Sequence, residues 1–186
     1  MKTPQFTEHR TESFNAVFKS LYNEISTISP VSEVFLWIKA SPLIHNDRFS
    51  WQVEAAGSDT EVSDKEREYF SELAGSLHIG VPVIIEEDDN EYPLLRSSKD
   101  LDTVIVIKLI DRVIISIFTP SKKAVKLKDH ILTEIDSFQK TAEYLYNCFS
   151  SAELHNIESY ISSGGSLENA PRKEMNALYH VAEALT

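Results

Sequence analysis

The chain has 186 residues, and its 29 Asp and Glu residues outnumber its 18 Lys and Arg residues, which gives a formal net charge of −11. Because a surface that binds nucleic acid or anionic lipid needs an excess of Lys and Arg, this balance argues against both kinds of partner. The single cysteine, Cys148, excludes a disulfide within one chain and a cysteine-based zinc site. No apolar run approaches the roughly 20 residues that cross a bilayer, and the first residues lack the apolar stretch of a signal peptide. We therefore expect a cytoplasmic globular protein with no membrane contact.

The first half of the chain predicts a helix, a hairpin and a second helix. Between residues 12 and 28, apolar residues recur at three- and four-residue steps, and Ser29-Pro30 ends this helix. Two strands, at about 33–40 and 48–54, are separated by turn residues and predict an antiparallel hairpin. Ser63 and Glu66 form a capping-box pattern that begins the next helix, and Gly80 is its expected end.

A short strand at 81–85 comes next, followed by five carboxylates within six positions. The runs 103–110 and 113–118 are the two most apolar segments of the chain, and only Asp111-Arg112 separates them. This spacing predicts a tight hairpin, and the near-continuous apolarity predicts strands covered on both faces. The acidic loop is expected to be solvated, with a Ca²⁺ or Mg²⁺ site as the alternative reading; its carboxylates are Glu86, Glu87, Asp88, Asp89 and Glu91.

A long helix is predicted at about 126–150, and its apolar residues follow a heptad spacing. A helix of this length measures about 38 Å, longer than an ordinary strand, so its second half should extend past the sheet. We therefore expect a homodimer, with exposed apolar residues on this helix at the interface. The expected interface residues are Phe138, Ala142, Leu145, Phe149 and Ala152.

Together these elements predict an α+β fold with about five strands, mostly antiparallel, and helices packed on the sheet. Residues 1–150 form this domain. Residues 151–186 form a helical tail, interrupted at residues 162–166, with a last helix that begins near Pro171.

Three stretches of the chain resemble the GAF domain, a small α/β sensor module. Gly80-Val81-Pro82 and the apolar residues up to Glu86 resemble the family's middle strand, the runs 103–110 and 113–118 resemble its closing hairpin, and the long helix that follows resembles its C-terminal helix. The resemblance implies a regulatory scaffold with a ligand pocket between the sheet and residues 80–98. The family's signatures for cyclic nucleotides, bilins and cyclic-di-GMP are missing, so the resemblance names neither ligand nor cofactor.

If a small ligand binds in such a pocket, placement in the chain selects six contact residues. The six residues are Trp37, Trp51, Glu86, Tyr92, Arg96 and Lys108. For Trp37 and Trp51, the alternative role is core packing.

Three classes of function follow from these features. The first is a cytoplasmic regulatory domain that binds a small ligand or a protein partner and dimerises through its terminal helices. The second is an acidic interaction adaptor or chaperone-like dimer without a small ligand. An enzyme ranks last, because no catalytic spacing and no metal-ligand spacing is present.

The single basic cluster is too small for DNA and suits an acidic partner or the acidic loop of the chain itself; it consists of Lys122, Lys123, Lys126 and Lys128.

Overall fold

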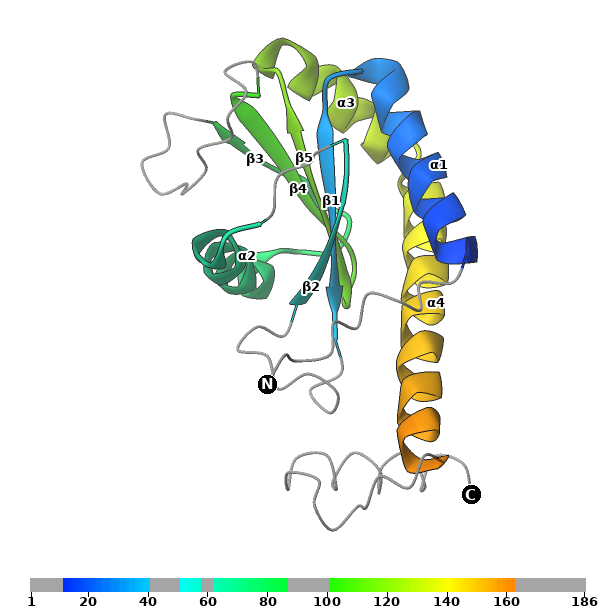
Figure 1. Cartoon of the computed structure of the whole chain (residues 1–186). Helices are drawn as coiled ribbons and strands as arrows, with labels where there is room; N and C mark the ends of the chain where they lie inside the picture. Colours follow the sequence, from blue (N-terminus) through cyan, green and yellow to red (C-terminus); the bar gives the residue numbers. More distant parts are fainter. Residues whose placement is uncertain (1–11, 41–50, 58–61, 87–100, 163–186) are drawn as a thin grey trace.

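The computed structural model describes residues 12–40, 51–57, 62–86 and 101–162, with side chains up to residue 152. Four helices and five strands form the predicted α+β fold (Figure 1). The elements in chain order are α1 (Glu12–Ile28), β1 (Glu33–Lys39), β2 (Trp51–Ala56), α2 (Asp64–Ser76), β3 (Val83–Glu86), β4 (Thr103–Ile110), β5 (Val113–Thr119), α3 (Ser121–Thr133) and α4 (Ile135–Ser162).

All five strands belong to one sheet in the order β2-β1-β5-β4-β3, and each neighbouring pair is antiparallel. The two most apolar runs are β4 and β5, which confirms the predicted hairpin. Every residue of β5 is buried, because this strand lies in the middle of the sheet and both of its faces are covered. Helices α1, α3 and α4 lie on one face of the sheet, and α2 lies on the other (Figure 1).

The two faces of the sheet carry different side chains, because successive residues of a strand point to opposite faces. The face toward α1, α3 and α4 is aliphatic, with side chains such as Leu36, Ile107 and Ile115. The face toward α2 is rich in aromatic rings and carries Phe35, Trp37, Trp51 and Phe118.

Helix α2 begins as the capping box predicts. The backbone N–H of Ser63 donates to Glu66 Oε2 at 2.7 Å, and the Ser63 Oγ accepts from the backbone N–H of Glu66 at 3.3 Å. The expectation that Gly80 ends this helix is wrong, since the helix ends at Ser76 and Leu77 is already extended. Gly80 instead has a φ of 75° and donates its N–H to Lys108 O at 2.8 Å, so it turns the chain toward β3.

The expected single helix at 126–150 is two helices, α3 and α4, which meet at Glu134. Glu134 leaves the helical region with φ −104° and ψ 21°. No glycine or proline lies at this position, so no local sequence signal marks the break. Ile131 before the break and Phe138 after it both belong to the same core.

The expectation that the heptad residues of α4 are exposed is also wrong for Phe138, Ala142 and Leu145. The exposed fraction is 1% for Phe138, 1% for Ala142 and 0% for Leu145, while Phe149 is half-buried against the same core. Helix α1 runs alongside α4 (Figure 1), and these residues lie in a core that α4 shares with α1, α3 and the sheet. Helix α1 contributes its own apolar stripe to the shared core, through Phe14, Phe18, Leu21 and Ile25. Phe138, Ala142 and Leu145 are therefore core residues of one protomer, and the structure leaves Ala152 half-buried.

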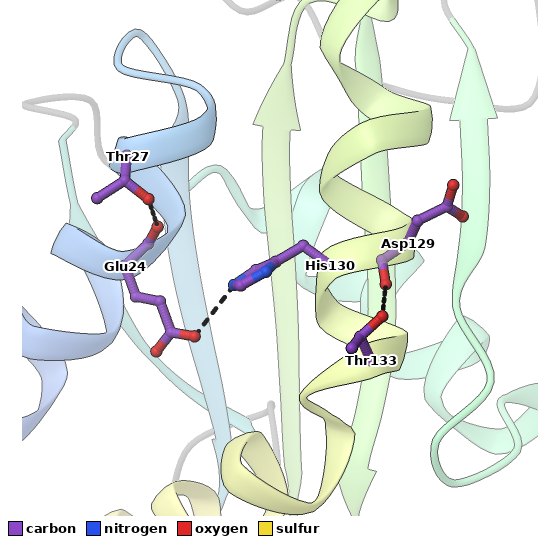
Figure 2. A network of polar contacts seen from close by, with 5 residues as sticks. All are labelled: Glu24, Thr27, Asp129, His130 and Thr133. Carbon is purple, nitrogen blue, oxygen red and sulfur yellow. Dashed lines mark hydrogen bonds and ion pairs between the residues drawn. The ribbon is translucent and has the colours of Figure 1, made fainter.

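Polar contacts tie the helical layer together at two places. His130 Nε2 on α3 lies 3.1 Å from Glu24 Oε1 on α1, and Figure 2 shows the two side chains pointing toward one another. The hydroxyls of Thr27 and Thr133 instead donate to carbonyls of their own helices. At the turn between β4 and β5, Arg112 donates to the Tyr146 hydroxyl of α4, and its guanidinium carbon lies 5.3 Å from the ring centroid. This hydrogen bond raises the pKa of Arg112 and anchors the hairpin turn on α4.

Helix α4 passes through the expected domain boundary at residue 150 without a break and ends at Ser162. Residues 163–186, which include the predicted last helix near Pro171, lie outside the described residues. In the part of the chain that the structure describes, no helix combines the length and apolarity that a bilayer crossing requires.

Candidate functional site

The α2 face of the sheet brings together three of the six residues that the sequence selects. Trp37 on β1 is the register partner of Ile114 on β5, and Ile114 is the partner of Lys108 on β4. Partners across a sheet share one face, so Trp37 and Lys108 lie on the same side, about 10 Å apart with one strand between them. Trp51 is the partner of Lys39, two residues along β1 from Trp37, and therefore also lies on this face.

Trp37 is held by one ring and one hydroxyl. Its ring centroid lies 4.4 Å from that of Phe70 on α2, and its indole Nε1 donates to Ser116 Oγ on β5 at 2.9 Å. Both partners of this hydrogen bond are buried, with exposed fractions of 2% for Trp37 and 0% for Ser116. The indole therefore has a fixed position, because a buried N–H that loses its acceptor costs free energy.

A layer of large rings separates α2 from the strands. Phe35 and Phe118 meet edge to face at 5.4 Å between centroids, and Tyr69 packs on Phe70 in the same way. Helices α3 and α4 lie directly on β4, whereas the α2 backbone approaches no strand as closely within the described residues. The aromatic layer is thus the main contact between α2 and the sheet.

Lys108 places a cationic group at one end of this layer. Its side chain is 15% exposed, and its Nζ lies 3.1 Å from Asp111 Oδ1 in the hairpin turn. The hydrogen bond from Lys108, together with its charge, lowers the pKa of Asp111. Asp111 is 73% exposed, so the Lys108 ammonium is paired at the surface while its stem lies in the protein.

The other three selected residues do not join this group in the described structure. Glu86 is the register partner of Thr103, which places its side chain on the opposite face of the sheet, toward α3 and α4. Tyr92 and Arg96 lie in the segment 87–100, outside the described residues. Of the five carboxylates of the acidic loop, only Glu86 is described, and within the described residues no three His, Cys, Asp or Glu side chains gather in a group suited to a metal ion.

Sequence reasoning missed two residues that complete the aromatic layer, Ser116 and Phe70. Ser116 is the one hydroxyl inside the apolar run of β5, and that isolation was a usable signal, since a buried hydroxyl needs a partner. Phe70 appeared only as one apolar position of α2. Its contact with Trp37 depends on how α2 docks, which no local pattern encodes.

Chemically, this arrangement combines flat apolar rings, one buried donor–acceptor pair and one cationic group. In the described structure the rings pack on one another, the Trp37 N–H is satisfied by Ser116, and the Lys108 ammonium pairs with Asp111. Comparison of the chain with family models, with curated proteins and with solved structures finds no match. The GAF resemblance therefore stays a prediction from the residues that carry it.

Proposed function

We propose that this chain is a cytoplasmic regulatory domain of the GAF-like type, which binds a small planar ligand between α2 and the sheet. The observation that carries the proposal is the aromatic layer around Trp37 and Phe70, with the buried Trp37–Ser116 hydrogen bond beside it. On the other face the strands contribute aliphatic side chains, and the aromatic rings of that core come from its helices, such as Phe14, Phe18 and Phe138. The two faces of the sheet therefore differ in chemistry, because among the described strands the aromatic side chains point toward α2.

The order of elements supports this reading of the fold. The resemblance implies a helix, two strands, a helix, a middle strand, a closing hairpin and a long C-terminal helix, and the described elements follow that order except that the C-terminal helical segment is divided into α3 and α4. Ile85 of the middle strand β3 and Phe70 of α2 both pack in the core between α2 and the sheet. A ligand there would contact residues from α2 and from the sheet at once, so that binding would alter how α2 is held.

The chain has two tryptophans in all, Trp37 and Trp51, and both lie in the aromatic layer. Intrinsic tryptophan emission therefore reports on this side of the sheet alone. Native mass spectrometry of freshly purified protein tests whether a small molecule copurifies. A bound molecule that, when removed and added back, changes the tryptophan emission supports the proposal.

Two variants locate such a ligand. Trp51→Phe keeps a ring of smaller size and should weaken ligand binding, whereas Tyr144→Phe, on the exposed face of α4, should leave it unchanged. If no molecule copurifies, and a library of aromatic acids changes neither the emission nor the melting temperature, the proposed ligand site is wrong.

A second candidate function is an acidic interaction adaptor without a small ligand. The burial of the aromatic layer favours it. Trp37 and Trp51 are both buried, and Ser116 already satisfies the Trp37 N–H, so the described rings also make a complete core. A dimer through the terminal helices remains a prediction only for the part of α4 that follows Leu145, since Phe138, Ala142 and Leu145 are buried in the core of this chain. Light scattering distinguishes a monomer from that dimer.

A further inference from the structure

Helix α3 carries a basic surface on a strongly acidic protein. Four lysines lie within its thirteen residues, and the chain as a whole has a net charge of −11. Lys122 and Lys126 are exposed, and Lys123 is partly exposed. None of these three forms an ion pair with another described residue, while Lys128 lies 3.9 Å from its neighbour Asp129.

The position of these lysines on the helix is electrostatically unfavourable. The N-terminus of a helix has a partial positive charge, so acidic side chains stabilise its first turn and lysines destabilise it. The first turn of α3 contains Lys122 and Lys123 and no acidic residue. The nearby carboxylate that does compensate is Asp102, whose Oδ1 accepts from the Ser121 N–H at 2.6 Å. The lysines therefore do not serve the stability of this helix.

Two exposed aliphatic residues lie among the lysines. Val125 is 60% exposed and Leu132 is 41% exposed. They are seven residues apart, so they lie on one side of α3 about 10.5 Å apart. The opposite side of the helix, with Ala124, Leu127 and Ile131, is buried against the sheet. The solvent side of α3 thus combines positive charge with two exposed aliphatic side chains, and the carboxylate of Asp129 lies between them.

This combination favours a protein partner over nucleic acid and lipid. Nucleic acid would use the lysines alone, and a net charge of −11 opposes it and an anionic membrane alike. A protein segment with both carboxylates and aliphatic side chains would use the whole surface.

We propose that the solvent side of α3 is a docking surface for an acidic amphipathic segment of a partner protein. Aliphatic side chains of that segment pack on Val125 and Leu132, and its carboxylates pair with Lys122, Lys123 and Lys126. The surface lies on the side of the sheet opposite α2 (Figure 1), so partner binding does not involve the α2 face of the sheet.

The probe is a fluorescein-labelled synthetic helical peptide built from Glu, Leu and Ala, with its binding measured by fluorescence anisotropy against the full chain. The double variant Lys122→Glu/Lys126→Glu should weaken binding by about tenfold or more, since two pairs are lost and repulsion replaces them. Val125→Ser should weaken binding as well. The matched control is Lys19→Glu/Lys140→Glu, which changes the net charge equally at exposed positions of α1 and α4 and should have little effect.

Folding is controlled within the same series. Lys122→Glu places an acid in the first turn of α3, so its melting temperature should not fall, and it should rise if the helix dipole dominates. Loss of peptide binding by a variant that is at least as stable as the parent supports the docking surface.

Several results would overturn the proposal. One is that the α3 double variant binds the peptide as tightly as the parent, or that the α1/α4 control weakens binding to the same extent. Another is equal binding of a peptide in which Ser replaces every Leu. Tighter binding of a single-stranded oligonucleotide or of phosphatidylserine vesicles through the same lysines would assign the surface to another class of partner.

Discussion

Replacing Ser116 by Ala tests whether the buried polar pair of the aromatic layer is as tightly built as the distances indicate. The substitution removes one hydroxyl from a fully buried position and leaves the Trp37 N–H without its acceptor. The atom removed is small, so the cavity contribution is minor. The expected loss is the cost of an unsatisfied buried donor, about 1–3 kcal/mol of the free energy of unfolding.

A double-mutant cycle separates this hydrogen bond from the loss of ring packing. Trp37→Phe removes the donor and part of the ring, and in that background Ser116→Ala has no N–H left to strand. The second substitution should then cost much less, with a coupling free energy of about 1–2 kcal/mol between the two positions.

The assay is guanidinium denaturation followed by far-UV circular dichroism, so that the signal does not depend on the tryptophan that is changed. Ser20→Ala, at an exposed position of α1, is the matched serine control and should shift stability by less than about 0.5 kcal/mol. A Ser116→Ala variant as stable as the parent, or a cycle without coupling, would refute the reasoning, because the indole N–H would then have another partner.

The remaining predictions concern the packing of α4, a pH dependence and a glycine. Leu145→Ala should destabilise the chain by about 2–5 kcal/mol, because Leu145 is fully buried within one protomer; a denaturation midpoint that rises with protein concentration would point to a dimer interface instead. Partial burial alone raises the pKa of Asp102, but hydrogen bonds from Ser121 and Thr103 outweigh it and hold that pKa below the ordinary value of 3.8. Because the folded-state pKa is lowered, the carboxylate stabilises the fold above the unfolded-state pKa and loses that effect as the pH falls through the folded-state value. Asp102→Ala should therefore destabilise the fold near neutral pH, and denaturation curves of the parent and the variant should converge only as the pH falls through the lowered pKa of Asp102. Gly57→Ala should destabilise by more than about 1 kcal/mol, because Gly57 has a φ of 76° and a Cβ there would lie 2.8 Å from the Ser32 carbonyl oxygen. Gly75→Ala is its control, since nothing lies within 4 Å of a Cβ at that helical position, and equal effects of the two substitutions would contradict the close approach.

Much of the fold was predictable because its signals are local. The apolar period of residues 12–28 and the Ser29-Pro30 stop predicted α1 with the bounds that the structure shows. The Ser63–Glu66 capping box predicted the start of α2, and the spacing of the two apolar runs predicted the β4–β5 hairpin. In each case the residues that decide the structure are neighbours in the chain.

The candidate site was less predictable. Trp37, Trp51 and Lys108 were selected from the sequence and share one face of the sheet, but Glu86 does not. A shift of one residue in a strand register moves a side chain to the other face, and the register of β3 depends on its pairing with β4. Phe70 joins Trp37 through the docking of α2, which is likewise a contact between distant segments.

The sequence by itself determined the kinds of elements, their order, the α+β class and the excess of negative charge, because these depend on composition and on short-range spacing. Only the tertiary structure decided what each apolar stripe packs against. The heptad residues of α4 look in sequence like a seam for a second copy, and the structure buries Phe138, Ala142 and Leu145 in the core that α4 shares with α1, α3 and the sheet. Apolar burial stabilises a helix on any complementary surface, whether that surface comes from the same chain or from another. The spacing of the apolar stripe indicates that the helix packs against another surface, and the fold of the chain determines which surface that is.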